Sequence, residues 1–218
     1  MEKRLVRIKF EKMGDIKYIS HLDMGRTFQR ALRRIEAPLW FSEGFSPHPK
    51  LNFALPLSVG SESCCELLDV ALNADSPKGS LAGLGDQLPA GIKIISVDEA
   101  PEKKLSLIEY CSYRLTFPKM AELYDLVKEH FSKPVIVEKK GKNKSVDVEL
   151  NSLIRYIAFE ALNEDLVIDM TLPAGGERGY LSPELVVKSF EGDEKLKKLC
   201  EDCRIVRTGL YTGDGKPF

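Results

Sequence analysis

Residues 42–60 read SEGFSPHPKLNFALPLSVG, a proline-containing loop followed by a short apolar strand over 51–57. Pro47 and Pro49 fix φ on both sides of His48, and Pro49 drives His48 towards an extended conformation. We expect a stiff loop that presents one imidazole, because such prolines are tolerated only where the native backbone already matches them. A rigid turn whose surface histidine has no function is the alternative.

The chain before this loop is predicted to form a strand and a helix. Polar and apolar residues alternate over 4–12, which indicates a half-buried strand. Ser20 and Asp23 have the spacing of a capping box, so a helix is expected from 21 to about 35. Its apolar residues share one side at helical spacing: Met24, Phe28, Ala31, Leu32 and Ile35.

The opposite side of this helix carries a row of arginines, namely Arg26, Arg30, Arg33 and Arg34. Asp23 is the one acidic residue on that side, and guanidinium groups suit phosphate. The row is therefore either an ordinary solvated helix face or a surface that contacts phosphates. His21 stands at the helix N-terminus, which favours anions.

The remaining pattern predicts an α+β protein of two ferredoxin-like (split β-α-β) domains in tandem. Strands are expected over 65–72 and 92–97, with a glycine-weakened helix over 77–88 between them. A charged, proline-containing segment then separates the domains, at 1–98 and 110–218. The second domain is predicted to contain the following segments: strands at 110–117, 135–139, 146–150, 154–161, 166–172 and 205–211, helices at 118–131 and 183–190, and a frayed tail at 213–218.

The composition is that of an ordinary globular protein, with 218 residues, 43% apolar and 30% charged. No apolar run is long enough for a membrane span. Five cysteines without framework spacing favour the cytoplasm. The net charge of −1 hides an asymmetry, because residues 1–50 hold 11 Lys/Arg against 6 Asp/Glu while residues 51–110 hold 4 against 9. The distribution permits one basic face.

Two further motifs have weaker functional interpretations. The glycine-rich residues 173–179, PAGGERG, are either a plain turn or a backbone cradle for phosphate with Arg178. Cys200-x-x-Cys203 is half of a zinc motif, and four ligands are needed, so we expect no metal. His130 is expected to cap a helix.

Three segments closely resemble the radical SAM-linked protein family (DUF2344), a domain of unknown function. They are ISHLDMGRTFQRALRR at 19–34, GFSPHPKLNFALPLSVGSES at 44–63 and ELLDVAL at 66–72, with weaker likeness in RGYLSPELVV at 178–187 and IVRTGLY at 205–211. Family members stand alone or are fused to a B12-binding-type radical SAM protein. The resemblance implies an accessory to a radical SAM enzyme on a separate chain, with no cofactor of its own.

The leading hypothesis is thus a non-catalytic module that binds RNA, either tRNA or rRNA, for such an enzyme. The predicted RNA- or anion-binding residues are Arg26, Arg30, Arg33, Arg34, His48, Lys50 and Arg178, and the loop framework is Gly44, Phe45, Pro47 and Pro49. We expect one surface to be formed by Arg26, Arg30, Arg33, His48 and Lys50. One alternative is a metal-independent endoribonuclease of the CRISPR RNA-processing type, with His21 and His48 as acid and base. Another is a protein-only adaptor of the radical SAM partner.

Overall fold

The computed structural model describes residues 3–140, 145–176 and 179–218. The protein has a mixed α+β fold, with mostly antiparallel sheet and few helices. It divides into two compact units, Met1–Leu107 and Ile108–Phe218, called unit 1 and unit 2 below.

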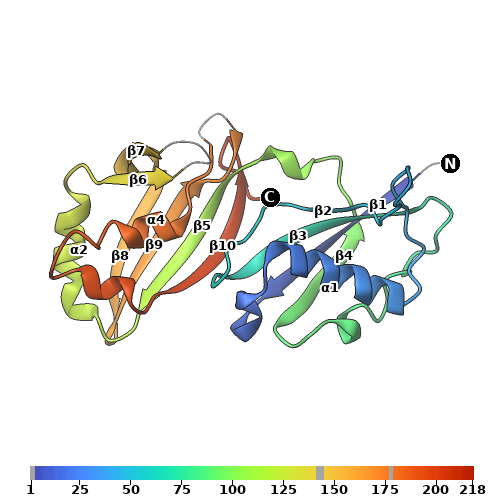
Figure 1. Ribbon diagram of the computed structural model, residues 1–218, viewed down its shortest axis with the longest axis horizontal. Helices are drawn as coiled ribbons and strands as arrows, with labels where there is room; N and C mark the ends of the chain where they lie inside the picture. Colours follow the sequence, from blue (N-terminus) through green and yellow to red (C-terminus); the bar gives the residue numbers. More distant parts are fainter. Residues whose placement is uncertain (1–2, 141–144, 177–178) are drawn as a thin grey trace. The chain divides into compact units, whose positions relative to one another are not determined.

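Unit 1 is a sheet covered on one face by a single long helix (Figure 1). Its elements are β1 (Lys3–Lys12), η1 (Gly14–Tyr18), α1 (His21–Arg34), β2 (Leu51–Phe53), β3 (Glu62–Asn73), η2 (Gly85–Gln87), β4 (Ile92–Glu99) and η3 (Leu105–Leu107). The strands run in the order β4-β1-β3-β2, and each neighbour is antiparallel.

The core of unit 1 lies between α1 and one face of the sheet. Alternate residues of β1 and β3 enter it, and the apolar side of α1 packs against them, as the periodicity predicts. The fully buried members of this cluster include Ile8, Phe28, Ala31, Leu32, Leu68, Val70 and Leu72. Ser20 Oγ accepts a hydrogen bond from the Asp23 amide at 3.1 Å, so the expected N-cap is formed.

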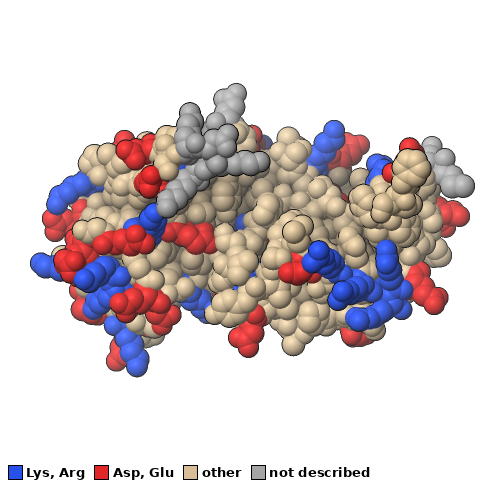
Figure 2. Space-filling model, viewed as in Figure 1, with Lys and Arg blue, Asp and Glu red and all other residues tan. Residues whose placement is uncertain are grey.

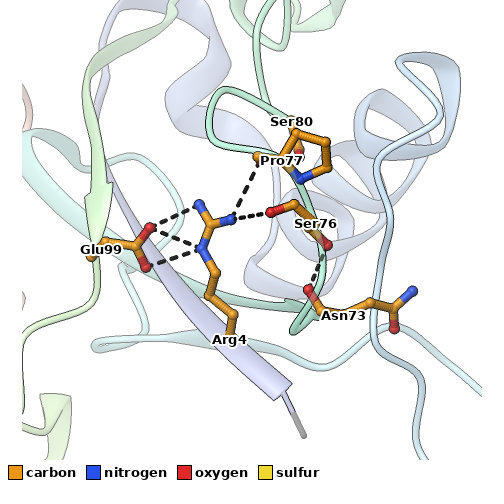
Figure 3. Close-up of polar contacts among 6 residues, drawn as sticks. All are labelled: Arg4, Asn73, Ser76, Pro77, Ser80 and Glu99. Carbon is orange, nitrogen blue, oxygen red and sulfur yellow. Dashed lines mark hydrogen bonds and ion pairs between the residues drawn. The ribbon is translucent and has the colours of Figure 1, made fainter. Parts of the chain in front are cut away.

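The helix expected over residues 77–88 is replaced by turns, with only η2 at its end. Gly79 and Gly83 have φ values of +82° and +78°, which a helix does not allow. Arg4 holds this segment to the sheet (Figure 3). Its Nε donates to Glu99 Oε1 at 2.8 Å, and its Nη1 donates to the Ser76 carbonyl at 2.7 Å.

Unit 2 repeats a four-stranded antiparallel arrangement, in the order β10-β5-β9-β8 (Figure 1). Its elements are β5 (Ile108–Phe117), η4 (Ala121–Leu123), α2 (Tyr124–Phe131), β6 (Ile136–Lys140), β7 (Ser145–Glu149), α3 (Leu150–Leu153), β8 (Tyr156–Leu162), β9 (Asp165–Pro173), α4 (Pro183–Lys188), η6 (Lys197–Cys200) and β10 (Arg204–Thr212). Strands β6 and β7 form a separate two-stranded sheet.

Aromatic rings join the helices of unit 2 to its sheet. The Phe190 ring, which follows α4, lies 6.2 Å from Phe117 of β5 and 6.1 Å from Phe131 of α2. The expectation of a frayed tail is wrong, because the tail turns back onto β10. Phe218 N donates to the Leu210 carbonyl at 2.9 Å, which pairs the tail with the strand.

Candidate functional site

The loop over residues 42–48 is closed by hydrogen bonds at its base. The Ser42 amide donates to the His48 carbonyl at 2.9 Å, and the His48 amide donates to Ser42 Oγ at 3.1 Å. Ser42 Oγ also lies 3.0 Å from His48 Nδ1. His48 Nδ1 also lies 3.4 Å from the Ser46 carbonyl oxygen, so the imidazole is held against the loop itself.

The tip of this loop exposes an aromatic ring to solvent. Gly44 has φ of +113°, a conformation that side chains avoid, and it turns the chain there. The Phe45 side chain is fully exposed, and Phe41 at the base of the loop is 41% exposed. Pro49 is buried and bridges to Phe41, whereas Pro47 stays at the surface. The loop is therefore fixed at its base while its ring faces water.

A groove of about 350 Å³ adjoins this loop in unit 1. Its lining includes His48, Lys50 and Asn52 on the loop side and Lys3 and Asp69 on the sheet side. Both lysines are exposed, and neither has an acidic partner within the described part of the chain. We call this feature the lysine groove.

The carboxylate of Asp69 in the lysine groove is paired with an arginine. Arg7 Nε and Nη2 donate to the two Asp69 oxygens at 2.7 and 2.9 Å, and Nη2 also donates to the Lys103 carbonyl at 3.1 Å. Both side chains are about nine-tenths buried. Because the arginine offsets the negative charge, the groove is left with the positive charge of its two lysines.

The arginines of α1 form a second basic surface, which we call the arginine face. Figure 2 shows Lys and Arg gathered over α1, and Arg26, Arg30, Arg33 and Arg34 are all exposed. Arg26 Nη1 pairs with Asp23 at 3.0 Å. Hydrogen bonds from Ser20 and then from Arg26 lower the pKa of the Asp23 carboxyl. In residues 3–140, 145–176 and 179–218, the other three arginines have no ion-pair partner.

The lysine groove and the arginine face lie on opposite sides of the sheet of unit 1. Val6 and Val70 pack in the core beneath α1, whereas their strand neighbours Leu5 and Ala71 line the groove. Successive residues of a strand point to opposite faces. The structure thus groups His48 with Lys50 and keeps both apart from the arginines, so the single surface predicted for these residues is wrong.

The two histidines considered as an acid–base pair do not meet. The His21 ring packs edge-on against Phe53, with centroids 5.2 Å apart. Phe53 follows His48 by five residues of extended chain, which span about 16 Å at roughly 3.3 Å per residue. One scissile phosphate cannot contact both rings across that distance, because general acid–base transfer needs hydrogen-bond reach.

Comparisons with known proteins place the chain in a family. The model of a family described as "Uncharacterized protein conserved in bacteria (DUF2344)" matches residues 5–183. The chain belongs to this family. No curated protein matches the sequence.

Three solved structures cover most of the DUF2344 chain with low identity and low TM-scores. An unknown protein from Galdieria sulphuraria has 12% identity and a TM-score of 0.28, covering 94% of this chain and 99% of its own. A putative glycine cleavage system transcriptional repressor has 8% identity and a TM-score of 0.28, covering 95% and 99%. An encapsulated DyP-type peroxidase from Mycobacterium smegmatis has 10% identity and a TM-score of 0.26, covering 95% and 91%.

The other residues considered in the sequence analysis, namely Arg178, the Cys200-x-x-Cys203 pair and His130, form no further site among the described residues. Arg178, predicted to contact an anion, lies outside the described residues, while the adjoining Leu181 amide donates to the Pro173 carbonyl at 2.9 Å. Where the chain is described, no group of three or more His, Cys, Asp and Glu could hold a metal ion. Burial raises the pKa of the Cys203 thiol to about 12, which disfavours the thiolate that metals bind. His130 Nε2 lies 3.1 Å from Ser189 Oγ.

Two groove residues of this DUF2344 protein were missed at the level of sequence. Lys3 and Asp69 reach the lysine groove through the pairing of β1 with β3, in which Arg7 is directly opposite Asp69. The alternation over residues 4–12 does place Arg7 on the outer face. The register that aligns Arg7 with Asp69, and Asp69 with Asn52, is a long-range property, and no local pattern encodes it. None of the described helices has the length and hydropathy needed to cross a bilayer.

Proposed function

We propose that this DUF2344 protein is a non-catalytic RNA-binding module that presents tRNA or rRNA to a separate radical SAM enzyme. Its main support is the stiff loop of residues 42–48, which exposes Phe45 at its tip and brings His48 to the lysine groove. The radical SAM partner is supported by the sequence resemblance in residues 19–72. The five free cysteines favour the cytoplasm as the site of action.

The charge of the lysine groove suits a phosphate of the RNA backbone. Lys3 and Lys50 contribute two ammonium groups, and the Asp69 carboxylate is already bound by Arg7. Phosphate contacts supply most of the sequence-independent affinity for nucleic acid. A groove of about 350 Å³ is at the small end of ligand sites, which suits a single nucleotide of a longer strand.

The exposed ring of Phe45 suits an unpaired base. Stacking of a base on an aromatic side chain contributes about 1–3 kcal/mol and tolerates any base. Because the loop is closed by the bonds between Ser42 and His48, little conformational entropy is lost when a base stacks on it. Single-stranded loops of tRNA and rRNA carry such bases.

The arginine face offers additional phosphate contacts to a different part of the RNA. Since surface charges act over a Debye length of about 8 Å at physiological ionic strength, arginines beyond the sheet contribute little at the lysine groove. An RNA that contacts both surfaces must extend around unit 1. The separation of His21 from His48 gives no support to an endoribonuclease using both rings.

The ferredoxin-like architecture of each unit is also a proposal. The strand orders β4-β1-β3-β2 and β10-β5-β9-β8 support it, since a split β-α-β arrangement places its first and third strands at the centre of the sheet. In unit 1 the second crossover, residues 74–91, contains turns and η2 in place of a helix.

Fluorescence anisotropy with labelled tRNA tests the RNA proposal. The double variant Lys3→Glu/Lys50→Glu is expected to weaken binding at least tenfold and to flatten the dependence of affinity on salt. A variant with two exposed lysines of unit 2 changed in the same way, Lys133→Glu/Lys195→Glu, has the same net charge and should bind as wild type. Equal affinity of all three proteins, or no binding by wild type at 50 mM salt, would contradict the proposal.

A protein-only adaptor is the second candidate, and the exposed Phe45 ring favours it too. Aromatic side chains are frequent anchors of protein interfaces. After ribonuclease treatment, the radical SAM enzyme should then still co-purify with wild type and be lost with Phe45→Ser. Loss of the partner upon ribonuclease treatment of wild type would instead assign the contact to RNA.

A further inference from the structure

The sheet of unit 2 has one face in the core and one face open to solvent. On β5 the residues Cys111, Tyr113 and Leu115 are buried in the core. Their neighbours Ser112 and Arg114 point to the other face, since side chains alternate along a strand. This open face carries hydroxyl groups and aromatic rings, together with the ion pair between Arg114 and Asp169.

Two rows of paired residues cross this open face. One row joins Tyr156 of β8, Thr171 of β9, Ser112 of β5 and Gly209 of β10. The hydroxyl groups of Ser112 and Thr171 are 2.8 Å apart. In the adjoining row, Tyr110 lies directly opposite Tyr211.

Two hollows, of about 280 and 400 Å³, lie over these rows. They share the side chains of Tyr156, Thr171 and Tyr211, so they form one shallow groove across the four strands. We call it the tyrosine groove. From β8 to β10 it spans three strand spacings, about 14 Å, which is long enough for a short stretch of extended single strand.

The ring of Tyr211 lies across the backbone of β10. A Cβ atom on Gly209 would be 2.6 Å from Tyr211 Oη and 2.8 Å from its Cε2. The phenol therefore occupies the space above this glycine and lies over the strand. A ring that lies on a sheet in this way offers its flat side to a ligand.

Arg155 holds its guanidinium group at one end of the tyrosine groove. The guanidinium carbon lies 4.6 Å from the centroid of the Tyr110 ring, and Nη1 donates to the Gly213 carbonyl at 3.2 Å. Its backbone amide is also fixed, to the Thr171 carbonyl at 2.9 Å. Stacking and hydrogen bonding orient the group in advance, and among the described residues it has no acidic partner.

Next to Arg155 in the sequence, the side chain of Tyr156 is 57% exposed. The groove thus combines a positive group without an acidic partner, two accessible phenol rings and a row of hydroxyl groups. Backbone phosphates, bases and ribose hydroxyls of single-stranded RNA are complementary to these three features respectively. An RNA duplex buries its base faces, so it cannot use the rings.

We propose that the tyrosine groove binds a single-stranded segment of RNA, with bases on Tyr156 and Tyr211 and a phosphate at Arg155. The choice of RNA as ligand rests on the proposed function, but the site is separate from the lysine groove. The segment is recognised by stacking and charge, so little sequence preference is expected.

Binding of a labelled 12-nucleotide oligouridine to the full chain tests the inference. Tyr156→Ala is expected to weaken the affinity about five- to 100-fold, while Tyr156→Phe keeps the ring and should change it less than threefold. Affinity for a hairpin RNA with a fully paired stem and a minimal loop should stay within threefold for both variants. Thermal unfolding of each variant checks that unit 2 remains folded.

Photocrosslinking gives a second readout that loss of folding cannot mimic. Oligouridine carrying 5-bromouracil should crosslink to peptides that contain Tyr156 or Tyr211, and Arg155→Ala should reduce the yield. Crosslinks confined to unit 1, or equal affinities of Tyr156→Ala and Tyr156→Phe, would overturn the inference while leaving the RNA proposal intact. Absence of any RNA binding by wild type would overturn both.

Discussion

Replacing Arg7 by methionine is predicted to destabilise the protein severely. The bidentate pair with Asp69 has distances of 2.7 and 2.9 Å, and its side chains are 10% and 11% exposed. Arg7→Met leaves a buried carboxylate without its arginine and removes the donor to the Lys103 carbonyl. Breaking one side of a buried pair costs about 3–5 kcal/mol, mostly as the penalty for the charge that is left behind.

Arg114→Met is a control matched in geometry and not in burial. Arg114 donates to the two oxygens of Asp169 at 2.8 and 2.7 Å, but the side chains are 50% and 34% exposed. Water solvates both partners once the pair is broken, so the expected cost is about 0–1 kcal/mol. The two substitutions differ mainly in how much solvent reaches the carboxylate.

Urea unfolding followed by circular dichroism at pH 7 measures the free energy of unfolding that each variant loses, and thermal unfolding measures the change in Tm. For a chain of this length each kcal/mol shifts Tm by about 2–4 °C, so Arg7→Met is expected to lower Tm by roughly 6–20 °C. The double variant Arg7→Met/Asp69→Leu should recover much of the loss, because it leaves no buried charge. Equal losses in Arg7→Met and Arg114→Met would refute the reasoning from burial.

Three further substitutions follow from single contacts. Gly91→Ala should cost about 1–3 kcal/mol more than Gly79→Ala in urea unfolding. Both glycines have positive φ, but only at Gly91 would the new Cβ clash with the Met13 carbonyl oxygen. Burial lowers the pKa of His130, so the folded state binds its proton less readily than the unfolded chain; stability should fall as the pH drops below about 6.5, and His130→Asn should flatten that slope. Ser20→Ala removes the N-cap of α1 and is expected to cost about 1 kcal/mol, whereas Ser20→Asp should cost little.

The parts of the fold that could be predicted from the sequence are those set by local patterns. The capping box and the 3.6-residue periodicity predict a helix over 21–35, and α1 is His21–Arg34. Alternation over 4–12 predicts a strand, and β1 is Lys3–Lys12. In both segments the propensity, the cap and the burial pattern agree with one another.

Segments with conflicting local signals were predicted less well. Ser76 and Pro77 form a good helix start, yet the glycines that follow adopt positive φ and the chain turns instead. The apolar run over 51–57 forms a strand only at Leu51–Phe53, and the Ala54 amide makes one more hydrogen bond to β3, to the Leu67 carbonyl. The rings at 110, 156 and 211 gave no sequence signal, because only sheet pairing brings them together.

The separation of His48 from the arginines follows from how β2 and α1 pack on the sheet of unit 1. Leu51 and Phe53 pack against the core beneath α1, so Lys50, one residue earlier, must face away from that helix. The arginines face away from the sheet for the same reason. In a two-layer unit the exposed side of the helix and the exposed face of the sheet are opposite surfaces.

This geometry sets a limit on how the two basic surfaces can act together. Sites more than about 7–10 Å apart with no shared partner have additive effects. The free-energy losses of Lys3→Glu/Lys50→Glu and of Arg30→Glu/Arg33→Glu in tRNA binding should therefore sum, within about 0.5 kcal/mol, in the fourfold variant. Suppose that both double variants lose affinity, and that the fourfold variant binds tRNA as tightly as the double variant with the lower affinity. The two surfaces would then hold the same phosphates, which the intervening sheet does not allow.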